Sequence, residues 1–211
     1  MEHKHVSLAD QVFERLEADI LGGKYARGEV LTEMMLCADL GVSRTPVREA
    51  THRLAQEHIV EITAKGITVL GVTDKDLSDI YDIRMRLEGM AAVFAARNAT
   101  EEQISAMKEA LELQEFYCGK KDAERIRLMD SRFHDLVYTA ADSVVLYDTL
   151  LPLHKKTQKF RKASVENHSR AEASLDEHRA IYDAVAAHDE KAAEAAMCIH
   201  VEHAKNHILK G

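Results

Sequence analysis

The chain has 211 residues, of which 46% are hydrophobic, and it carries a formal net charge of −8 at neutral pH. This length allows one large domain or two small ones, and the acidic balance argues against indiscriminate binding to nucleic acid or anionic membranes. No apolar stretch is long enough to cross a bilayer and the first residues lack a signal-peptide pattern, so we expect a cytoplasmic protein.

The glycines divide the chain into two parts. Six of the nine lie before residue 72, and the remaining residues contain only Gly89, Gly119 and the terminal Gly211. We therefore predict two domains, 1–71 and 72–211, joined by a short connection. The three cysteines are far apart and form no Cys-x-x-Cys, which argues against a disulfide framework and against a thiolate zinc site.

The first domain begins with two helices. Apolar residues spaced three or four apart predict a helix over 8–20 that ends at Gly22-Gly23. A second, short helix is predicted over 32–40, and Gly41 breaks it.

A third helix and a hairpin follow. Ser43 or Thr45 can cap this helix, and Pro46 then falls in its first turn, where its missing N–H costs little. The strand-like sequence over 59–72 folds back at a tight tip, Ala64-Lys65-Gly66. Three helices followed by a small hairpin predict a winged helix-turn-helix.

Two arginines mark the start of the third predicted helix. Arg44 and Arg48 lie one turn apart, and no acidic residue precedes Glu49 in this helix. The N-terminal residues of a recognition helix contact base edges, and its N–H groups favour phosphate. An arginine fork on guanine contributes about 1–3 kcal/mol of discrimination. The alternative is a solvated helix start with two incidental arginines, which the neighbouring glycine turn and basic wing tip disfavour.

The charge of the first domain limits how it can bind DNA. Residues 1–71 carry 8 lysines and arginines against 11 acidic residues. Long-range attraction to DNA is therefore weak, and selective binding needs a few well-placed arginines in two copies of the domain. We expect a homodimer on a pseudo-palindromic, double-stranded DNA operator.

The second domain is predicted to be all helical. Hydroxyl residues at 73, 100 and 169 stand three residues before an acid or amide and are start signals. The predicted helices are 74–97, 101–118, 121–140, 143–163, 170–187 and 190–209. The expected fold class is mainly α, a winged helix-turn-helix of three helices plus a β-hairpin wing, followed by an all-α bundle of six to seven helices.

Four polar residues lie on or beside inward-facing stripes of three predicted helices: Asp130, His134, His178 and His200. Alone, an Asp and a His four residues apart usually make a weak contact on a helix surface, and a lone His on an apolar stripe is more often a satisfied core residue. Four such groups in one bundle favour a common partner, which a divalent metal supplies. The residue types do not distinguish Zn, Ni, Fe and Mn.

Arg84 interrupts another apolar stripe, between Ile80 and Leu87. A guanidinium that faces a core needs an anion. One reading is an internal pair with Glu88 or with a carboxylate of another helix. The other is that Arg84 and the metal together hold a small carboxylate effector.

The segment "GKYARGEVLTEMMLCADLGVSRTPVREATHRLAQEHIVEITAKGITV" resembles the DNA-binding domain of the GntR superfamily of bacterial transcription regulators, and "LGVSRTPVREA" is its most specific stretch. The resemblance implies that Arg44, Thr45 and Arg48 reach the operator, with Ser43 on phosphate. It also implies that Lys65 and Gly66 at the wing tip enter the minor groove.

The resemblance extends into the second domain. "D-x3-H", then "EH" followed by "AIYDAVAAHDEKAA", then "M-x2-H" is similar to the FCD-type effector domain of the FadR-like branch of this superfamily. It implies a divalent metal held by Asp130, His134, His178 and His200, and small organic acids as effectors near Arg84. His203 and His207 are substitute ligands if the helix register differs. The implied function is a DNA-binding regulator, most simply a repressor, controlled by such an acid.

Two other functions compete with this interpretation. A metal-dependent helical hydrolase would use the same histidines, and "HD" occurs at 134–135 and 188–189. No obvious general base accompanies the proposed ligands, and an enzyme leaves the first domain unexplained. A DNA-binding regulator with a purely structural metal and no effector is the third alternative.

Overall fold

The computed structural model describes residues 7–157, 160 and 168–210, and the chain forms two compact units, 1–73 and 74–211. The division follows Thr73, two residues beyond the boundary expected from the glycines. Each unit has its own packing and is described by itself below.

The N-terminal unit is the winged helix-turn-helix that the sequence predicts. Its helices and hairpin strands are α1 (Leu8–Leu21), α2 (Glu33–Leu40), α3 (Arg44–Gln56), β2 (Val60–Thr63) and β3 (Gly66–Val69). Its core is formed by buried residues from all three helices and from the hairpin, including Leu16, Leu36 and Leu54. Gly41 ends α2 in the left-handed conformation, with φ of 67°, so the turn between α2 and α3 requires this glycine.

Two details of this unit differ from the prediction. A two-residue strand, β1 (Val30–Leu31), pairs antiparallel with β3 and gives the sheet order β1-β3-β2. Two residues are too short for an alternating pattern, so the sequence gives no signal for this strand. Ser43 occupies the N-cap position of α3, but its side chain makes no capping hydrogen bond.

The second unit is a bundle in which the structure describes six helices. They are α4 (Asp74–Asn98), α5 (Glu101–Lys120), α6 (Ala123–Ala140), α7 (Val144–Lys156), α9 (His168–Ala186) and α10 (Glu190–Lys210).

Most of the predicted starts and ends in the bundle agree with the structure to within two residues. The predicted capping box at α5 is confirmed, because the Thr100 hydroxyl accepts from Gln103 N and the Gln103 side chain accepts from Thr100 N. The prediction for Ser169 is wrong, since this residue lies inside α9. The predicted end of α7 at 163 is also wrong, because the helix ends at Lys156. Residues 158–159 and 161–163 of that prediction lie outside the described residues.

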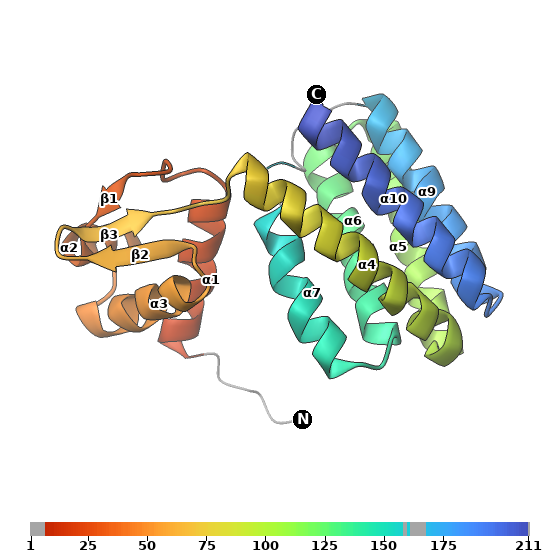
Figure 1. The fold of residues 1–211 in the computed structure, drawn as a ribbon, viewed down its shortest axis with the longest axis horizontal. Coiled ribbons are helices and arrows are strands. Elements are labelled where there is room, and N and C mark those ends of the chain that lie inside the picture. The colour runs from red at the N-terminus through yellow and green to blue at the C-terminus, as the bar shows by residue number, and fades with distance from the viewer. Residues whose placement is uncertain (1–6, 158–159, 161–167, 211) are drawn as a thin grey trace. The chain divides into compact units, whose positions relative to one another are not determined.

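Helix α4 has the central position in the bundle. It packs against α6, α7, α9 and α10 (Figure 1). Small residues, Ala91, Ala92 and Ala95, are fully buried along it and permit close packing of the neighbouring helices. A polar side chain that points inward from the middle of α4 can therefore contact several helices at once.

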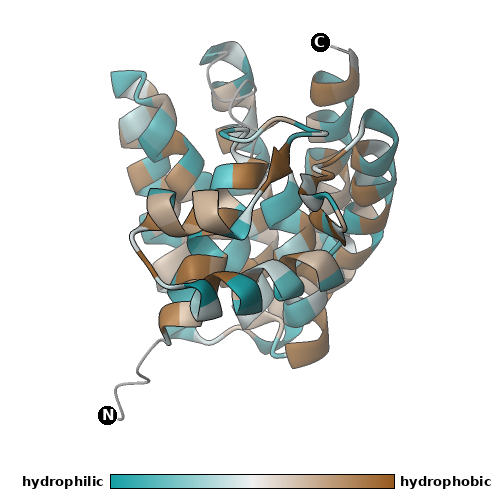
Figure 2. Cartoon of the chain, turned by 90° about the vertical axis from the view of Figure 1, so that its left-hand side faces the viewer, coloured by the Kyte–Doolittle hydropathy of each residue, from teal (hydrophilic) through white to brown (hydrophobic). Residues whose placement is uncertain are grey.

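The helices are amphipathic. In Figure 2 hydrophilic and hydrophobic residues alternate along them, as expected for helices that bury one face. Among the described residues, no helix is sufficiently long and apolar to span a membrane.

Replacing the α5 cap tests whether the predicted capping box stabilises the bundle. We expect Thr100→Ala to lose about 1 kcal/mol of the free energy of unfolding, because the Gln103 N–H loses its acceptor. For a chain of this size the melting temperature should fall by about 2–4 °C in a thermal unfolding experiment.

Thr149→Ala is the matched control. The exposed Thr149 hydroxyl donates to Val145 O within α7, where alanine is the better helix former, so the melting temperature should be unchanged or higher. Equal losses in both variants would contradict a specific capping effect.

Candidate metal and effector centre and DNA-binding surface

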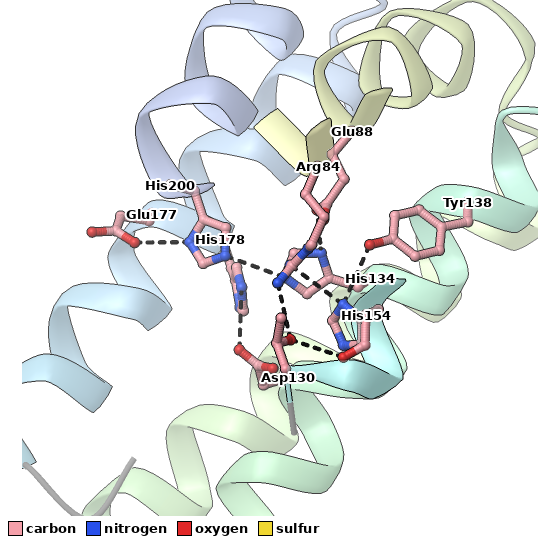
Figure 3. A network of polar contacts seen from close by, with 10 residues as sticks. Arg84, Glu88, Asp130, His134, Tyr138, His154, Glu177, His178 and His200 are labelled. Carbon is pink, nitrogen blue, oxygen red and sulfur yellow. Dashed lines mark hydrogen bonds and ion pairs between the residues drawn. The ribbon is translucent and has the colours of Figure 1, made fainter. Parts of the chain in front are cut away.

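The four predicted ligands come together in the middle of the helical bundle. Asp130 and His134 project from α6, His178 from α9 and His200 from α10, and all four are buried (Figure 3). The Nε2 atoms of His134 and His200 are 3.2 Å apart, and Asp130 Oδ1 lies 3.7 Å from His178 Nε2. One ligand nitrogen from each of the three histidines lies within 4.8 Å of the others.

Each of the three imidazoles has an oxygen partner on its other nitrogen. The pairs are His134 Nδ1 with Glu88 Oε2 at 3.0 Å, His178 Nδ1 with Gln114 Oε1 at 2.9 Å, and His200 Nδ1 with Glu177 Oε2 at 2.8 Å. For His134 the contact with Glu88 is a close approach without hydrogen-bond geometry. For His178 and His200 the contact is a hydrogen bond, which favours the tautomer that carries its proton on Nδ1 and leaves the Nε2 lone pair directed at the centre. This is the arrangement in which histidines bind metals.

Burial and charge keep this region in defined protonation states. Burial lowers the pKa of His200 to about 4, against the opposing effect of Glu177. Burial alone would raise the pKa of Glu177, but hydrogen bonds from His200 and Arg170 outweigh it and hold the value at about 2. At neutral pH His200 is therefore a neutral imidazole, the form in which a histidine can bind a metal, and Glu177 is a carboxylate.

The donor set fits a divalent transition metal. For metal to nitrogen bonds of about 2.0–2.1 Å, neighbouring donors should lie roughly 3.0–3.4 Å apart, and the two closest nitrogens meet this requirement. Three imidazoles and one carboxylate suit Zn, Ni, Fe and Mn alike. Of the substitute ligands, His203 is exposed and bonds to Glu177 Oε1 instead.

Arg84 forms an internal ion pair with Glu88, which is one of the two readings that the sequence allows. Its Nε donates to Glu88 Oε1 at 2.5 Å, and both residues are almost completely buried. Its Nη1 donates to Thr157 Oγ1 at 3.1 Å. Burial alone would lower the pKa of Arg84, but the negative charge of Glu88 outweighs it and raises this pKa. Arg84 therefore stays charged, and Glu88 neutralises it.

His154 of α7 also belongs to the centre and is absent from the sequence prediction. Its Nδ1 lies 3.4 Å from Arg84 Nη2 and 3.3 Å from the Tyr138 hydroxyl (Figure 3). Burial and the neighbouring Arg84 charge lower its pKa well below the usual value, so it is a neutral imidazole. The stripe of Leu146, Leu150 and His154 is the signal that would have identified it.

A small cavity adjoins the histidines. Its volume is about 30 Å³, room for roughly two water molecules. It is lined by Tyr81, Arg84, Asp130, His134, Arg170, Ala171, Ser174, His200, Ala204 and Ile208. Arg84 and three of the four predicted metal ligands therefore face one common space.

The predicted DNA-contacting residues lie at the exposed start of α3 and at the wing. Arg44, Thr45 and Arg48 line one open hollow on the surface of α3. The hollow does not include Ser43 or the wing residues, of which Lys65 lies in the turn between β2 and β3 and Gly66 is the first residue of β3.

Arg48 is held in place by an acidic residue of α2. Its Nε and Nη2 donate to the two carboxylate oxygens of Glu33, each at 2.9 Å, while the side chain of Arg48 remains 60% exposed. This two-pronged pair orients the guanidinium before any ligand arrives.

Both halves of the chain match known protein families. Residues 8–69 match the bacterial regulatory proteins of the gntR family, and residues 79–203 match the FCD domain. The chain belongs to the GntR family of bacterial transcription regulators, with an FCD domain.

Two curated relatives of this GntR-family regulator are similar over most of their length. The uncharacterized HTH-type transcriptional regulator YdhC of Bacillus subtilis is 30% identical, with 94% of this chain and 89% of the relative covered. The HTH-type transcriptional repressor RspR of Escherichia coli is 29% identical, with 91% of this chain and 85% of the relative covered.

Solved structures agree with this fold. Escherichia coli McbR/YncC has a TM-score of 0.84 at 24% identity and covers 97% of this chain and 98% of its own. A putative GntR regulator from Rhodococcus sp. RHA1 has a TM-score of 0.75 at 26% identity, with 96% and 98% covered. These relatives are transcription regulators, so the GntR-family chain is a DNA-binding regulator and not the metal-dependent hydrolase considered above.

Replacing Arg44 tests whether this GntR-family regulator reads its operator with the start of α3. We expect Arg44→Ala to weaken specific operator binding by about tenfold or more, because the substitution would remove the base contact predicted for this exposed arginine. Binding is measured by fluorescence anisotropy on a duplex selected from a random library.

Arg125→Ala, an exposed arginine of the helical unit, removes the same charge and is the control. Equal effects of the two substitutions would show that only total charge matters and would contradict direct reading by Arg44.

Proposed function

We propose that this GntR-family chain is a homodimeric repressor whose binding to a pseudo-palindromic operator is controlled by a small organic acid bound near a divalent metal in the helical unit. The observation that supports it most is the convergence of three buried Nε2 atoms and Asp130, with an oxygen close to every Nδ1. His134 and His200 can share one hydrogen bond between their Nε2 atoms, but a metal would satisfy all three Nε2 atoms and Asp130 at once.

The metal would be held by Asp130, His134, His178 and His200. When bound, the ion supplies a Lewis-acidic position at which an acid's oxygen can coordinate. Glu88, Gln114 and Glu177 orient the histidines through their Nδ1 atoms.

Arg84 would bring the acid to the same place. It lines the cavity beside His134 and His200, and it stays charged despite its burial. Glu88 accepts from Arg84 through one oxygen and lies against His134 with the other, so the guanidinium and the metal ligands are already linked by one carboxylate. An acid that binds both the metal and Arg84 would act on this link.

Helix α4 connects such an event to the DNA-binding unit. It begins at Asp74, immediately after the boundary between the two units, and it carries Arg84 and Glu88. A displacement of α4 on acid binding would change the placement or mobility of the winged domains. Coupling of this kind typically amounts to 1–3 kcal/mol.

A regulator with a purely structural metal is the second candidate. Two observations favour it: the cavity is only about 30 Å³, and Arg84 already has Glu88 and Thr157 as partners. An organic acid would need the cavity to enlarge.

Removing a proposed ligand tests the metal site. We expect the purified protein to hold one divalent ion per chain and His178→Ala to hold none, measured by elemental analysis. Glu177→Gln should keep the ligands but weaken metal affinity by about 10–100-fold, because His200 loses its orienting carboxylate.

His207→Ala is the matched control, because His207 lies on α10 outside the cluster. Metal content should be unchanged in this variant. Loss of the metal in His207→Ala and its retention in His178→Ala would contradict the assigned ligands.

A thermal-shift screen against small organic acids tests the effector. At a hundredfold excess over its Kd an acid should stabilise the metal-loaded protein by roughly 2.7 kcal/mol, or about 5–10 °C. The shift should disappear after metal removal. It should also disappear in the double variant Arg84→Met/Glu88→Gln, which avoids leaving Glu88 as an unpaired buried charge. Stabilisation by metal but by no acid would favour the structural-metal alternative.

A further inference from the structure

An acidic residue lies beside the DNA-binding surface and holds one of its arginines. Arg48 lines the hollow on α3, the second helix of the helix-turn-helix, which in this motif lies in the major groove. Glu33, in the first turn of α2, accepts from Arg48 Nε and Nη2 and does not line the hollow. A carboxylate repels phosphate, so its place next to an arginine of the recognition helix needs an explanation.

Stability does not explain this ion pair. The side chain of Arg48 is 60% exposed and that of Glu33 is 33% exposed, and ion pairs between exposed residues contribute little to the free energy of unfolding. An acid in the first turn also stabilises a helix through the helix dipole, but this effect needs no arginine. The hydrogen bonds from Arg48 lower the pKa of Glu33, so this side chain is a carboxylate at neutral pH.

The geometry of the pair leaves one edge of the guanidinium available. An arginine has five N–H donors in one plane. Glu33 takes the two donors of the side edge, at Nε and Nη2, and the end edge, at Nη1 and Nη2, has no partner among the residues that the structure describes. Guanine O6 and N7 accept two such parallel donors in the major groove. Arg48 can therefore form this fork with its end edge, in an orientation that is set before DNA arrives.

The pair also has no net charge. An arginine without an acidic partner displaces counterions from phosphates of any sequence, whereas an arginine neutralised by a carboxylate does so much less. Residues 1–71 are already acidic, with 8 lysines and arginines against 11 acidic residues. Glu33 should therefore weaken binding to DNA of every sequence while it increases the difference between sequences.

We propose that Glu33 is a positioning residue that determines the sequence specificity of the DNA-binding surface. It holds the side edge of Arg48, so that the end edge reads a guanine and the guanidinium does not bind phosphate. The inference concerns operator recognition and is independent of the proposed metal and acid. Glu33 acts through Arg48.

Single base-pair changes in one duplex test the inference on the full-length protein. The duplex is selected by the wild-type protein from a random library, and each of its base pairs is then changed in turn. The position read by Arg48 is the guanine whose replacement by adenine weakens wild-type binding by about tenfold but does not affect binding of Arg48→Ala. The Kd values for this duplex, for its adenine variant and for a random duplex are measured by fluorescence anisotropy.

Glu33→Gln removes the charge and the two-pronged acceptor. We expect the preference for guanine to fall from about tenfold to about threefold or less, because Arg48 is no longer held. The random duplex should bind about two- to threefold more tightly, because the released guanidinium can contact phosphate. For the same reason the slope of log affinity against log salt concentration should steepen by about one unit per domain.

Two further variants separate geometry from charge. Glu33→Asp keeps the charge but is shorter by one methylene, so it should lose the guanine preference without binding the random duplex more tightly. Combining Glu33→Gln with Arg48→Ala should give the same guanine preference as Arg48→Ala alone, as expected for a residue that acts through Arg48. Glu14→Gln, an exposed position on α1, removes the same charge from the same unit and should leave the guanine preference unchanged.

Three outcomes would overturn the inference. The first is an undiminished guanine preference in Glu33→Gln, with or without a lower melting temperature, which would reduce Glu33 to a helix-stabilising acid. The second is an equal loss of preference in Glu14→Gln, which would show that only total charge matters. The third is the absence of any guanine whose effect depends on Arg48. None of these measurements requires metal or acid, so they remain valid if the proposed effector control fails.

Discussion

The buried ion pair of Arg84 and Glu88 holds the centre of the helical unit together. Glu88 contacts Arg84 with one oxygen and His134 of α6 with the other, while Arg84 reaches His154 and Thr157 at the end of α7. Removing either partner alone would leave a buried charge, at a cost of about 3–5 kcal/mol. Apolar residues could fill the same volume without a buried charge. The presence of this ion pair is therefore best explained by a role in the adjacent histidine site.

The polar centre is built in two layers. Nε2 atoms of three histidines face one another, acceptors from α5 and α9 bond to the Nδ1 atoms of His178 and His200, and Glu88 of α4 lies close to His134 Nδ1. Because these groups come from three helices, the orientation of each ring depends on the packing of the whole bundle. A change in the position of α4 would therefore alter the proposed metal ligands, and a ligand at the proposed metal site would alter α4.

The sequence predicted the fold and the inward-facing polar residues of the bundle because both depend on local periodicity. Helical stripes identified Asp130, His178 and His200 from residues three or four positions away. The partners of these residues could not be predicted in the same way, because Gln114 and Glu177 are assigned to their histidines only by the packing of different helices. Arg84 shows the same limit: its stripe revealed that it needs an anion, but not which anion.

In the N-terminal unit, an ion pair between two helices at the surface could not be predicted from periodicity. The recognition helix was predicted from its glycine turn and arginines, whereas the pair of Arg48 with Glu33 depends on how α2 meets α3. If Arg48 contacts the operator as predicted, this pair would help an acidic domain to be selective. It presents an oriented guanidinium without adding the net positive charge that would attract DNA of any sequence.

The central claim is that acid binding and operator binding are linked, and linkage is reciprocal. We would measure by calorimetry the affinity of the most stabilising acid for the free protein and for the operator-bound protein. A repressor released by its effector must bind the acid more weakly when on DNA, by about 5–150-fold, and the acid must weaken operator binding by the same factor. Equal acid affinities in the two states would contradict the account, because a ligand without differential affinity shifts no equilibrium.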